Sequence, residues 1–142
     1  MILRIVIFDR DVEALDRLNY ILSSQGHEVL CFAEPYICPI YSNVSSACPQ
    51  STACVDILLI DNNMPKMTGL EFVRQQSING CNGIIRNKAV MSANWTSEQV
   101  EAATNFQIKI FSKPLNHHAL LQWLGERQRD LNPSRRLVSL SI

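Results

Sequence analysis

The chain has 142 residues, 46% of them hydrophobic, and its 13 Lys and Arg balance its 13 Asp and Glu. This length suits one domain with its own core, while the composition excludes a disordered chain, a basic nucleic-acid-binding surface and a membrane-spanning segment. The apolar stretch at 1–8 is too short for an export signal, so we expect a soluble, cytoplasmic domain that does not contact nucleic acid or membranes directly.

The first part of the chain predicts two strands with a helix between them. The apolar run at 2–8 is typical of a buried strand, and Asp11 is suited to cap a helix whose apolar residues recur at helical spacing. Gly26 stands just past the end of that helix, where a left-handed residue is favoured. Residues 27–32 then predict a second strand.

The stretch at 35–52 breaks this regularity. It contains three of the six prolines and many Ser and Asn residues, so any helix within it is expected to be short or broken. Cys38, Cys48 and Cys54 cluster in and just after it, without a CxxC pair or a neighbouring histidine. Zinc sites normally contain such a pair or a nearby histidine, and the five cysteines are an odd number, so we expect free thiols.

The middle of the chain continues the alternation of strands and helices. The most apolar strand, at 55–60, leads into Asp61 and a loop with the sequence NNMPKMTG. A short helix is expected at 70–77, then a mostly irregular segment, and then a fourth strand at 88–92.

The last two helices carry capping signals. Thr96 and Gln99 have the spacing of a capping box, and Asn105 is suited to a left-handed stop after that helix. A fifth strand is predicted at 107–112, and Asn116 can cap the final helix.

Five apolar strands alternating with helices predict an α/β fold with a parallel sheet covered on both faces. We expect this domain to span 1–131, with 132–142 as a flexible C-terminal tail. Functional groups in such sheets lie at the carboxyl ends of the strands. Four polar residues end or follow strands here: Asp9, Asp61, Ser92 and Lys113. Two carboxylates, a hydroxyl and an ammonium group at one edge are typical of a site that accepts a phosphoryl group on a carboxylate with the help of Mg²⁺.

At this point the chain resembles the receiver domain of bacterial two-component response regulators. The resemblance covers residues 2 to about 130 and implies a flavodoxin-like, doubly wound, five-stranded parallel sheet. Four motifs carry it, in that family's order and close to its spacing: IVIFDRD (5–11), LLIDNNMPKMTGLEF (58–72), VMSAN (90–94) and FSKPL (111–115).

The resemblance implies a role for each residue at the strand ends. Asp61 would be the phosphoacceptor, Ser92 the switch hydroxyl that meets the phosphoryl group, and Lys113 the lysine that pairs with that group. Pro114 matches a proline that usually follows a cis peptide bond in the family and would aim the lysine side chain.

The resemblance also implies a magnesium site, formed by Asp9, Asp61 and the backbone carbonyl of Asn63. The family normally carries two adjacent acids after the first strand, whereas this chain has Asp9 followed by Arg10. The Arg10 guanidinium would weaken magnesium binding or partly replace the charge of the ion. Asp11 is better placed to cap the helix than to supply the missing acid.

A second departure is Ile110, because this position is often aromatic in the family and coupled to the switch. The function implied is that of a stand-alone receiver, and not of an enzyme beyond slow self-dephosphorylation. It would take its phosphoryl group from a phosphohistidine on a sensor histidine kinase or a histidine phosphotransferase. It would then signal to a protein partner, or form a homodimer, through the fifth strand and its flanking helices, roughly 96–130.

Two alternatives stay open. The chain could be a pseudo-receiver, a protein-binding module that is never phosphorylated, and Arg10 is the main support for this interpretation. The run FDRDV (8–12) also resembles the first motif of haloacid-dehalogenase-like phosphatases, with Asp9 as nucleophile and Asp11 as general acid. Those enzymes need a further acidic pair after the lysine, and only Glu126 and Asp130 follow Lys113 here.

Overall fold

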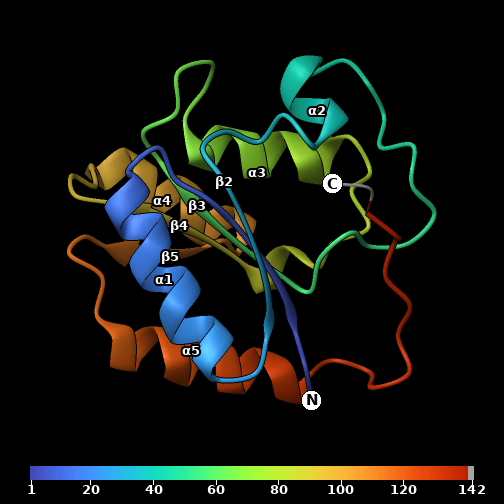
Figure 1. The fold of residues 1–142 in the computed structure, drawn as a ribbon. Helices are drawn as coiled ribbons and strands as arrows, with labels where there is room; N and C mark the ends of the chain where they lie inside the picture. The colour runs from blue at the N-terminus through green and yellow to red at the C-terminus, as the bar shows by residue number, and fades with distance from the viewer. Residues whose placement is uncertain (141–142) are drawn as a thin grey trace.

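The computed structural model describes residues 1–140, which form a five-stranded parallel sheet in the order β2-β1-β3-β4-β5 (Figure 1). The strands are β1 (Arg4–Phe8), β2 (Glu28–Phe32), β3 (Ile57–Asp61), β4 (Lys88–Ser92) and β5 (Lys109–Ser112). The helices are α1 (Val12–Ser24), α2 (Pro39–Ser42), α3 (Gly69–Ile78), α4 (Ser97–Phe106) and α5 (His117–Arg129), with a 3-10 turn at Ile85–Asn87.

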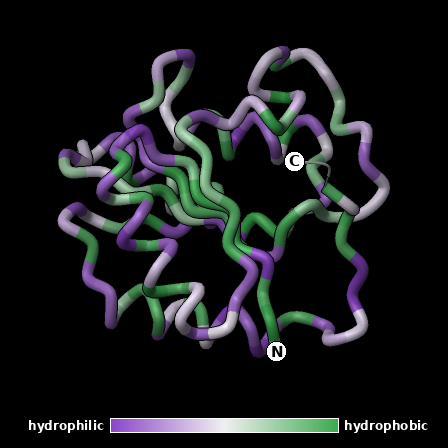
Figure 2. Tube along the Cα trace, in the orientation of Figure 1, coloured by the Kyte–Doolittle hydropathy of each residue, from purple (hydrophilic) through white to green (hydrophobic). Residues whose placement is uncertain are grey.

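Helices cover both faces of the sheet, which confirms the predicted doubly wound architecture. Successive strand residues alternate between two cores, so Ile5 and Ile7 pack with α1 and α5 while Val6 and Phe8 pack with α2, α3 and α4. Figure 2 shows the resulting band of apolar strands through the middle of the molecule. None of the helices within residues 1–140 has the length and apolar character that crossing a membrane requires.

The helix caps follow the local sequence signals, with one exception. The Asp11 carboxylate accepts hydrogen bonds from two amides at the start of α1, and Thr96 and Gln99 form the predicted capping box. The prediction for Asn105 is wrong, because α4 continues through Phe106 and the left-handed residue is Gln107, with φ 61°. Phe106 packs into the core beneath α4, and this contact keeps it in helical conformation.

The proline-rich segment contributes to the core despite its irregular backbone. Its helix, α2, has only four residues, as the composition predicted. Ile40 and Tyr41 are nevertheless almost fully buried, and the Tyr41 ring packs edge-on against Phe72 of α3 with the ring centroids 5.5 Å apart. The segment is therefore anchored to the sheet through α3.

The described part of the tail beyond residue 131 contacts the domain, and its expected flexibility stays a prediction. This part runs from α5 along one side of the molecule toward α3 (Figure 1). The Arg135 guanidinium binds both carboxylate oxygens of Asp56, and the Val138 amide donates to the carbonyl of Ala53 at 2.9 Å. These contacts fix the tail across the amino-terminal edge of the sheet, and the last two residues of the predicted tail lie outside the described residues.

Replacing Arg135 should therefore destabilise the domain. The Arg135→Ala variant leaves the Asp56 carboxylate buried with one remaining donor, the Arg4 amide at 2.8 Å, so we expect the free energy of unfolding to fall by roughly 1–3 kcal/mol. The neighbouring exposed Arg136 is the matched control, and Arg136→Ala should change stability by no more than about 0.5 kcal/mol. Urea denaturation measures both values, and equal effects would mean that the tail is not anchored through Arg135.

Candidate functional site

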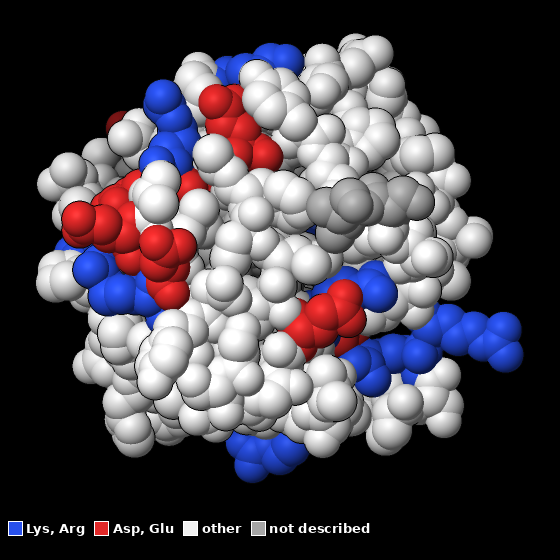
Figure 3. Space-filling view, in the orientation of Figure 1, with Lys and Arg blue, Asp and Glu red and all other residues white. Residues whose placement is uncertain are grey.

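Three of the predicted residues meet at the carboxyl edge of the sheet. The Lys113 ammonium lies 2.8 Å from Asp9 Oδ2 and 3.4 Å from Asp61 Oδ2. The residues follow β1, end β3 and follow β5, so one cation joins the ends of three strands. Figure 3 shows acidic side chains gathered over this edge, on the left of the molecule, with basic side chains beside them.

Asp9 is held by contacts at both carboxylate oxygens. Its side chain is fully buried, Oδ1 accepts a hydrogen bond from the Asp11 amide at 2.9 Å, and Oδ2 faces Lys113. The Asp9 amide donates to the carbonyl of Phe32 at 3.1 Å, which ties it to the end of β2. A buried carboxylate with both oxygens satisfied is a fixed point of negative charge.

Asp61 is positioned by the loop that follows it. Its Oδ1 accepts from the Asn63 amide at 3.3 Å, and the Asn62 amide donates to the carbonyl of Met91 at 2.7 Å. The Asn62 side chain turns back to accept from the Leu70 amide at 3.0 Å, so it fixes the start of α3. Asn62 is a positioning residue that the sequence analysis did not single out. Its place directly after the strand-end Asp61 was a usable signal in the sequence, and the structure shows that its side chain is buried.

Gly69 is needed where the loop returns to the sheet. A Cβ atom at this position would lie 2.6 Å from the backbone carbonyl oxygen of Asp61, closer than real side chains come. Because the obstacle is backbone, a side chain at residue 69 would displace Asp61 itself. The glycine of the NNMPKMTG loop therefore sets the position of the candidate phosphoacceptor.

Ser92 is buried at the end of β4, next to β3 in the sheet. Its hydroxyl oxygen accepts from the Asn94 amide at 3.1 Å, and its backbone carbonyl accepts from the Lys113 amide at 2.9 Å. The Trp95 indole adds a second link, because its Nε1 donates to the carbonyl of Phe111 at 2.9 Å. The segments carrying Ser92 and Lys113 are therefore connected by backbone and side chain.

The remaining predicted residues surround this centre. Arg10 is exposed and takes part in none of the ion pairs found within residues 1–140, while Asp11 caps α1. Asn63 is exposed beside Asp61, and the peptide bond before Pro114 is cis. Ile110 is half-buried and packs into the core shared by α3 and α4.

The two carboxylates compete for one ammonium group. Burial raises the pKa of Asp61, and the neighbouring negative charge of Asp9 raises it further, while Lys113 only partly offsets both effects. Burial alone would lower the pKa of Lys113, but its hydrogen bond to Asp9 and the charges of Asp9 and Asp61 outweigh burial and raise that pKa. The Lys113 ammonium thus stays charged, and the negative charge of Asp61 is only partly compensated.

The oxygen-bearing groups at this edge are of the chemical type that magnesium prefers. Within residues 1–140 no group of three or more His, Cys, Asp and Glu side chains is arranged to hold a metal ion. Magnesium, however, is commonly bound by one or two carboxylates, with water and phosphate oxygens completing its shell. Asp61 and the exposed Asn63 lie at this edge, whereas Asp9 is fully buried with its two oxygens engaged by the Asp11 amide and by Lys113, so Asp9 would have to release Lys113 to coordinate an ion.

Opposite stability effects are expected for the two acids. A raised pKa means that the charged form of Asp61 destabilises the native state, so Asp61→Asn should increase the free energy of unfolding at pH 7. The gain should shrink as the pH falls toward 3.8, the ordinary value for this group, because the wild-type carboxyl then becomes neutral. Asp9→Asn should instead lower stability at pH 7, because Lys113 loses its closer partner. Denaturation at pH 7 and pH 4 measures the change in the free energy of unfolding for both variants. A lower free energy of unfolding for Asp61→Asn than for the wild type at pH 7 would contradict this view of the site.

Comparison with known proteins identifies the fold. No family model matches the chain, and no curated protein matches its sequence. A CheY-like response regulator receiver domain from Methanospirillum hungatei is 20% identical with a TM-score of 0.68, over 92% of this chain and all of that one (100%). A two-component response regulator from Clostridium difficile is 15% identical with a TM-score of 0.68, over 91% of this chain and 98% of that one.

A candidate pilus assembly protein (cpaE) from Burkholderia thailandensis also shares the architecture, at 19% identity and a TM-score of 0.65, over 92% of this chain and 100% of that one. Identities this low establish the fold, and the names of these proteins differ, so function must be argued from the site itself. The predicted flavodoxin-like fold is confirmed: the chain folds like the CheY-like receiver domains of response regulators.

Proposed function

We propose that this protein is a receiver that accepts a phosphoryl group on Asp61 from a phosphohistidine. The observation that carries the proposal is the Lys113 ammonium, which lies between Asp9 and Asp61 at the carboxyl edge of the sheet. It places a fixed positive charge 3.4 Å from the carboxylate that would be phosphorylated. The donor would be a sensor histidine kinase or a histidine phosphotransferase.

The chemistry assigned to the chain is a transfer between two side chains. A carboxylate oxygen of Asp61 attacks phosphorus, the bond from phosphorus to the imidazole nitrogen breaks, and the imidazole leaves with its electron pair. Lys113 pairs with a phosphoryl oxygen, and the Ser92 hydroxyl, freed from the Asn94 amide, donates to another. Because the Lys113 charge is already in place, little rearrangement is needed to receive the dianion.

Magnesium would be bound by Asp9, Asp61 and the carbonyl of Asn63, and would neutralise charge on the phosphoryl oxygens. Arg10 occupies the position where an acid would complete this set. Since Arg10 makes no ion pair within residues 1–140, its guanidinium is available to face an incoming phosphoryl group. We propose that Arg10 weakens magnesium binding and supplies part of its charge.

The proposed output surface is the face formed by β4, α4, β5 and α5. Ser92 and Lys113 both lie at its edge, and the hydrogen bond from Trp95 to Phe111 links the β4–α4 connection to β5. Movement of Ser92 toward a phosphoryl group would disturb this link and shift the arrangement of α4. The same face is the proposed binding surface for a downstream protein or a second copy of the chain, and Ile110 would take the place of the usual aromatic residue beneath it.

One alternative keeps specific support. The exposed Arg10 next to the site is compatible with a protein-binding module that is never phosphorylated. The phosphatase alternative has less support, because the Asp11 carboxylate accepts from the Glu13 and Ala14 amides at the start of α1 instead of facing a substrate.

Incubation with acetyl phosphate and Mg²⁺ tests phosphorylation directly. Intact-mass analysis should show one added phosphoryl group of about 80 Da in the wild type and in the control Asp16→Asn, which alters an exposed acid of α1. Asp61→Asn should show none. No adduct in the wild type would favour the unphosphorylated module, and an adduct lost in Asp9→Asn but kept in Asp61→Asn would favour the phosphatase.

Arg10→Asp should restore the second acid of the magnesium site. We expect the Mg²⁺ concentration for half-maximal phosphorylation to fall by about tenfold or more, because a carboxylate replaces a repelling cation beside the ion. Arg129→Asp, an equal charge change on an exposed residue of α5, is the matched control and should leave this concentration unchanged. An equal response of the two variants would show that Arg10 acts only through the net charge of the protein.

A further inference from the structure

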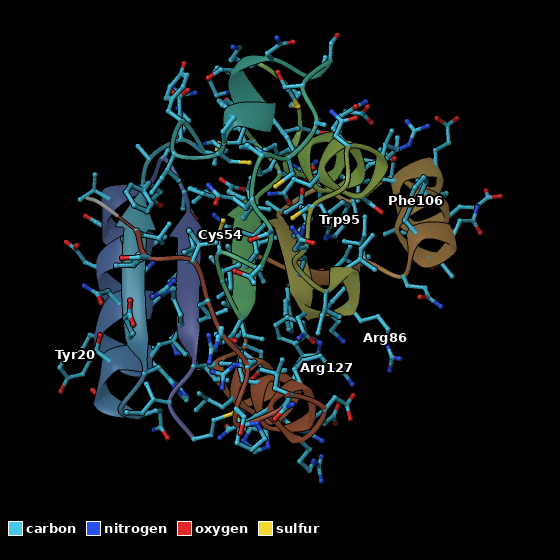
Figure 4. All side chains as sticks on the ribbon, turned by 90° about the vertical axis from the view of Figure 1, so that its right-hand side faces the viewer. Tyr20, Cys54, Arg86, Trp95, Phe106 and Arg127 are labelled. Atoms are coloured by element: carbon cyan, nitrogen blue, oxygen red, sulfur yellow. The ribbon has the colours of Figure 1, made fainter. Side chains whose placement is uncertain are left out.

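A second polar cluster lies away from the carboxyl ends of the strands, in a cavity between the sheet and α2 and α3. The cavity has a volume of about 100 Å³ and is lined mainly by apolar side chains from β1, β3 and α2. Four of the five cysteines line it: Cys38, Cys48, Cys54 and Cys81. Figure 4 labels Cys54 near β3 and shows further sulfur atoms toward α2 and α3.

The unusual member of this cluster is Lys88, the first residue of β4. Its side chain is only 2% exposed, and within residues 1–140 it pairs with no carboxylate. Its Nζ donates instead to Gln76 Oε1 at 2.9 Å and to Cys81 Sγ at 3.2 Å. A buried ammonium group without a counter-ion is strongly unfavourable, so the environment of Lys88 calls for a negative charge.

Cys81 is placed to provide that charge. Its sulfur also accepts from the Gly83 amide at 3.4 Å, so two donors converge on it. A Cβ atom at Gly83 would lie 3.1 Å from Lys88 Cε and 3.4 Å from Cys81 Sγ, and the glycine leaves room for the pair. The loop itself is fixed, because the Cys48 amide donates to the Asn79 carbonyl at 2.9 Å and the Asn82 side chain donates to the carbonyl of Gln50 at 2.7 Å.

We propose that Cys81 is a thiolate paired with the Lys88 ammonium, and that it is the site at which hydroperoxides oxidise this protein. The thiolate is the nucleophilic form of cysteine, and a neighbouring lysine and backbone amide favour it. Cys81 is also partly exposed, which gives a small oxidant access to the sulfur. The inference does not rest on phosphorylation of Asp61.

Three of the other four thiols lack such stabilisation. Burial raises the pKa of Cys38, and its hydrogen bond with Gln76 offsets this only in part; burial also raises the pKa of Cys54, and the neighbouring Cys48 adds to that effect. Burial also raises the pKa of Cys31, which lies on β2 and packs with the opposite core. These three groups therefore stay protonated near neutral pH and are weak nucleophiles, so oxidation should favour Cys81 over each of them.

The reaction balances with the groups present and one peroxide. The Cys81 sulfur attacks one peroxide oxygen, the O–O bond breaks, and the sulfur is oxidised to a sulfenic acid while the peroxide is reduced. The departing hydroxide takes a proton from the Lys88 ammonium 3.2 Å from the sulfur and leaves as water. The product pair, a sulfenic acid and an amine, has a net charge of zero, as the thiolate and ammonium pair had before the reaction.

Peptide mapping after treatment with substoichiometric hydrogen peroxide and dimedone, which traps sulfenic acids, tests the proposal. In the wild type most of the trapped adduct should lie on Cys81. Lys88→Met, which keeps an unbranched side chain one atom shorter and removes its charge, should lower labelling of Cys81 by at least about tenfold. Lys66→Met is the matched control, since Lys66 is exposed and lies over the rings of Tyr36 and Tyr41 instead.

A second measurement needs no variant. In the folded wild type, limiting iodoacetamide should alkylate Cys81 at least about ten times faster than Cys31, although both are partly exposed. Labelling spread evenly over the cysteines in either experiment, or equal loss in Lys88→Met and Lys66→Met, would overturn the proposal.

Discussion

The arrangement of the site depends on one cation shared by two acids. Lys113 connects the ends of β1, β3 and β5 through Asp9 and Asp61, and two carboxylates with one ammonium leave a negative charge uncompensated. Asp9 is fully buried and takes the shorter contact, so the unbalanced charge falls on Asp61. The fold thereby leaves the negative charge of Asp61 less fully compensated than that of Asp9.

Features governed by neighbours in the sequence could be predicted, because capping and strand alternation depend on residues a few positions apart. The caps at Asp11 and Asn116 and the placement of Asp61 at a strand end are of this kind. The stop at Asn105 failed because burial of Phe106, a tertiary contact, outweighed the local preference. The unequal sharing of Lys113 between Asp9 and Asp61 could not be predicted, since it follows from distances across the sheet.

Composition was least informative where distant segments meet. The proline-rich segment suggested a loose loop, yet Tyr41 reaches the core through Phe72. Nothing in the sequence singled out Arg135, yet it binds Asp56, 79 residues earlier in the chain. Lys88 fitted a strand pattern, and only the fold shows that its ammonium is buried against Cys81. In each case the decisive partner lies far away in the sequence.

The indole of Trp95 is an intrinsic fluorescent probe of the site. It is half-buried, and its hydrogen bond to Phe111 holds it between the strand that ends at Ser92 and the strand that leads to Lys113. The emission of an indole depends on its hydrogen bonding and its contact with water, so a rearrangement of either strand end changes the light that Trp95 emits. The other tryptophan, Trp123, lies on α5 against the Phe111 ring in the opposite core, so both indoles contact the same residue of β5.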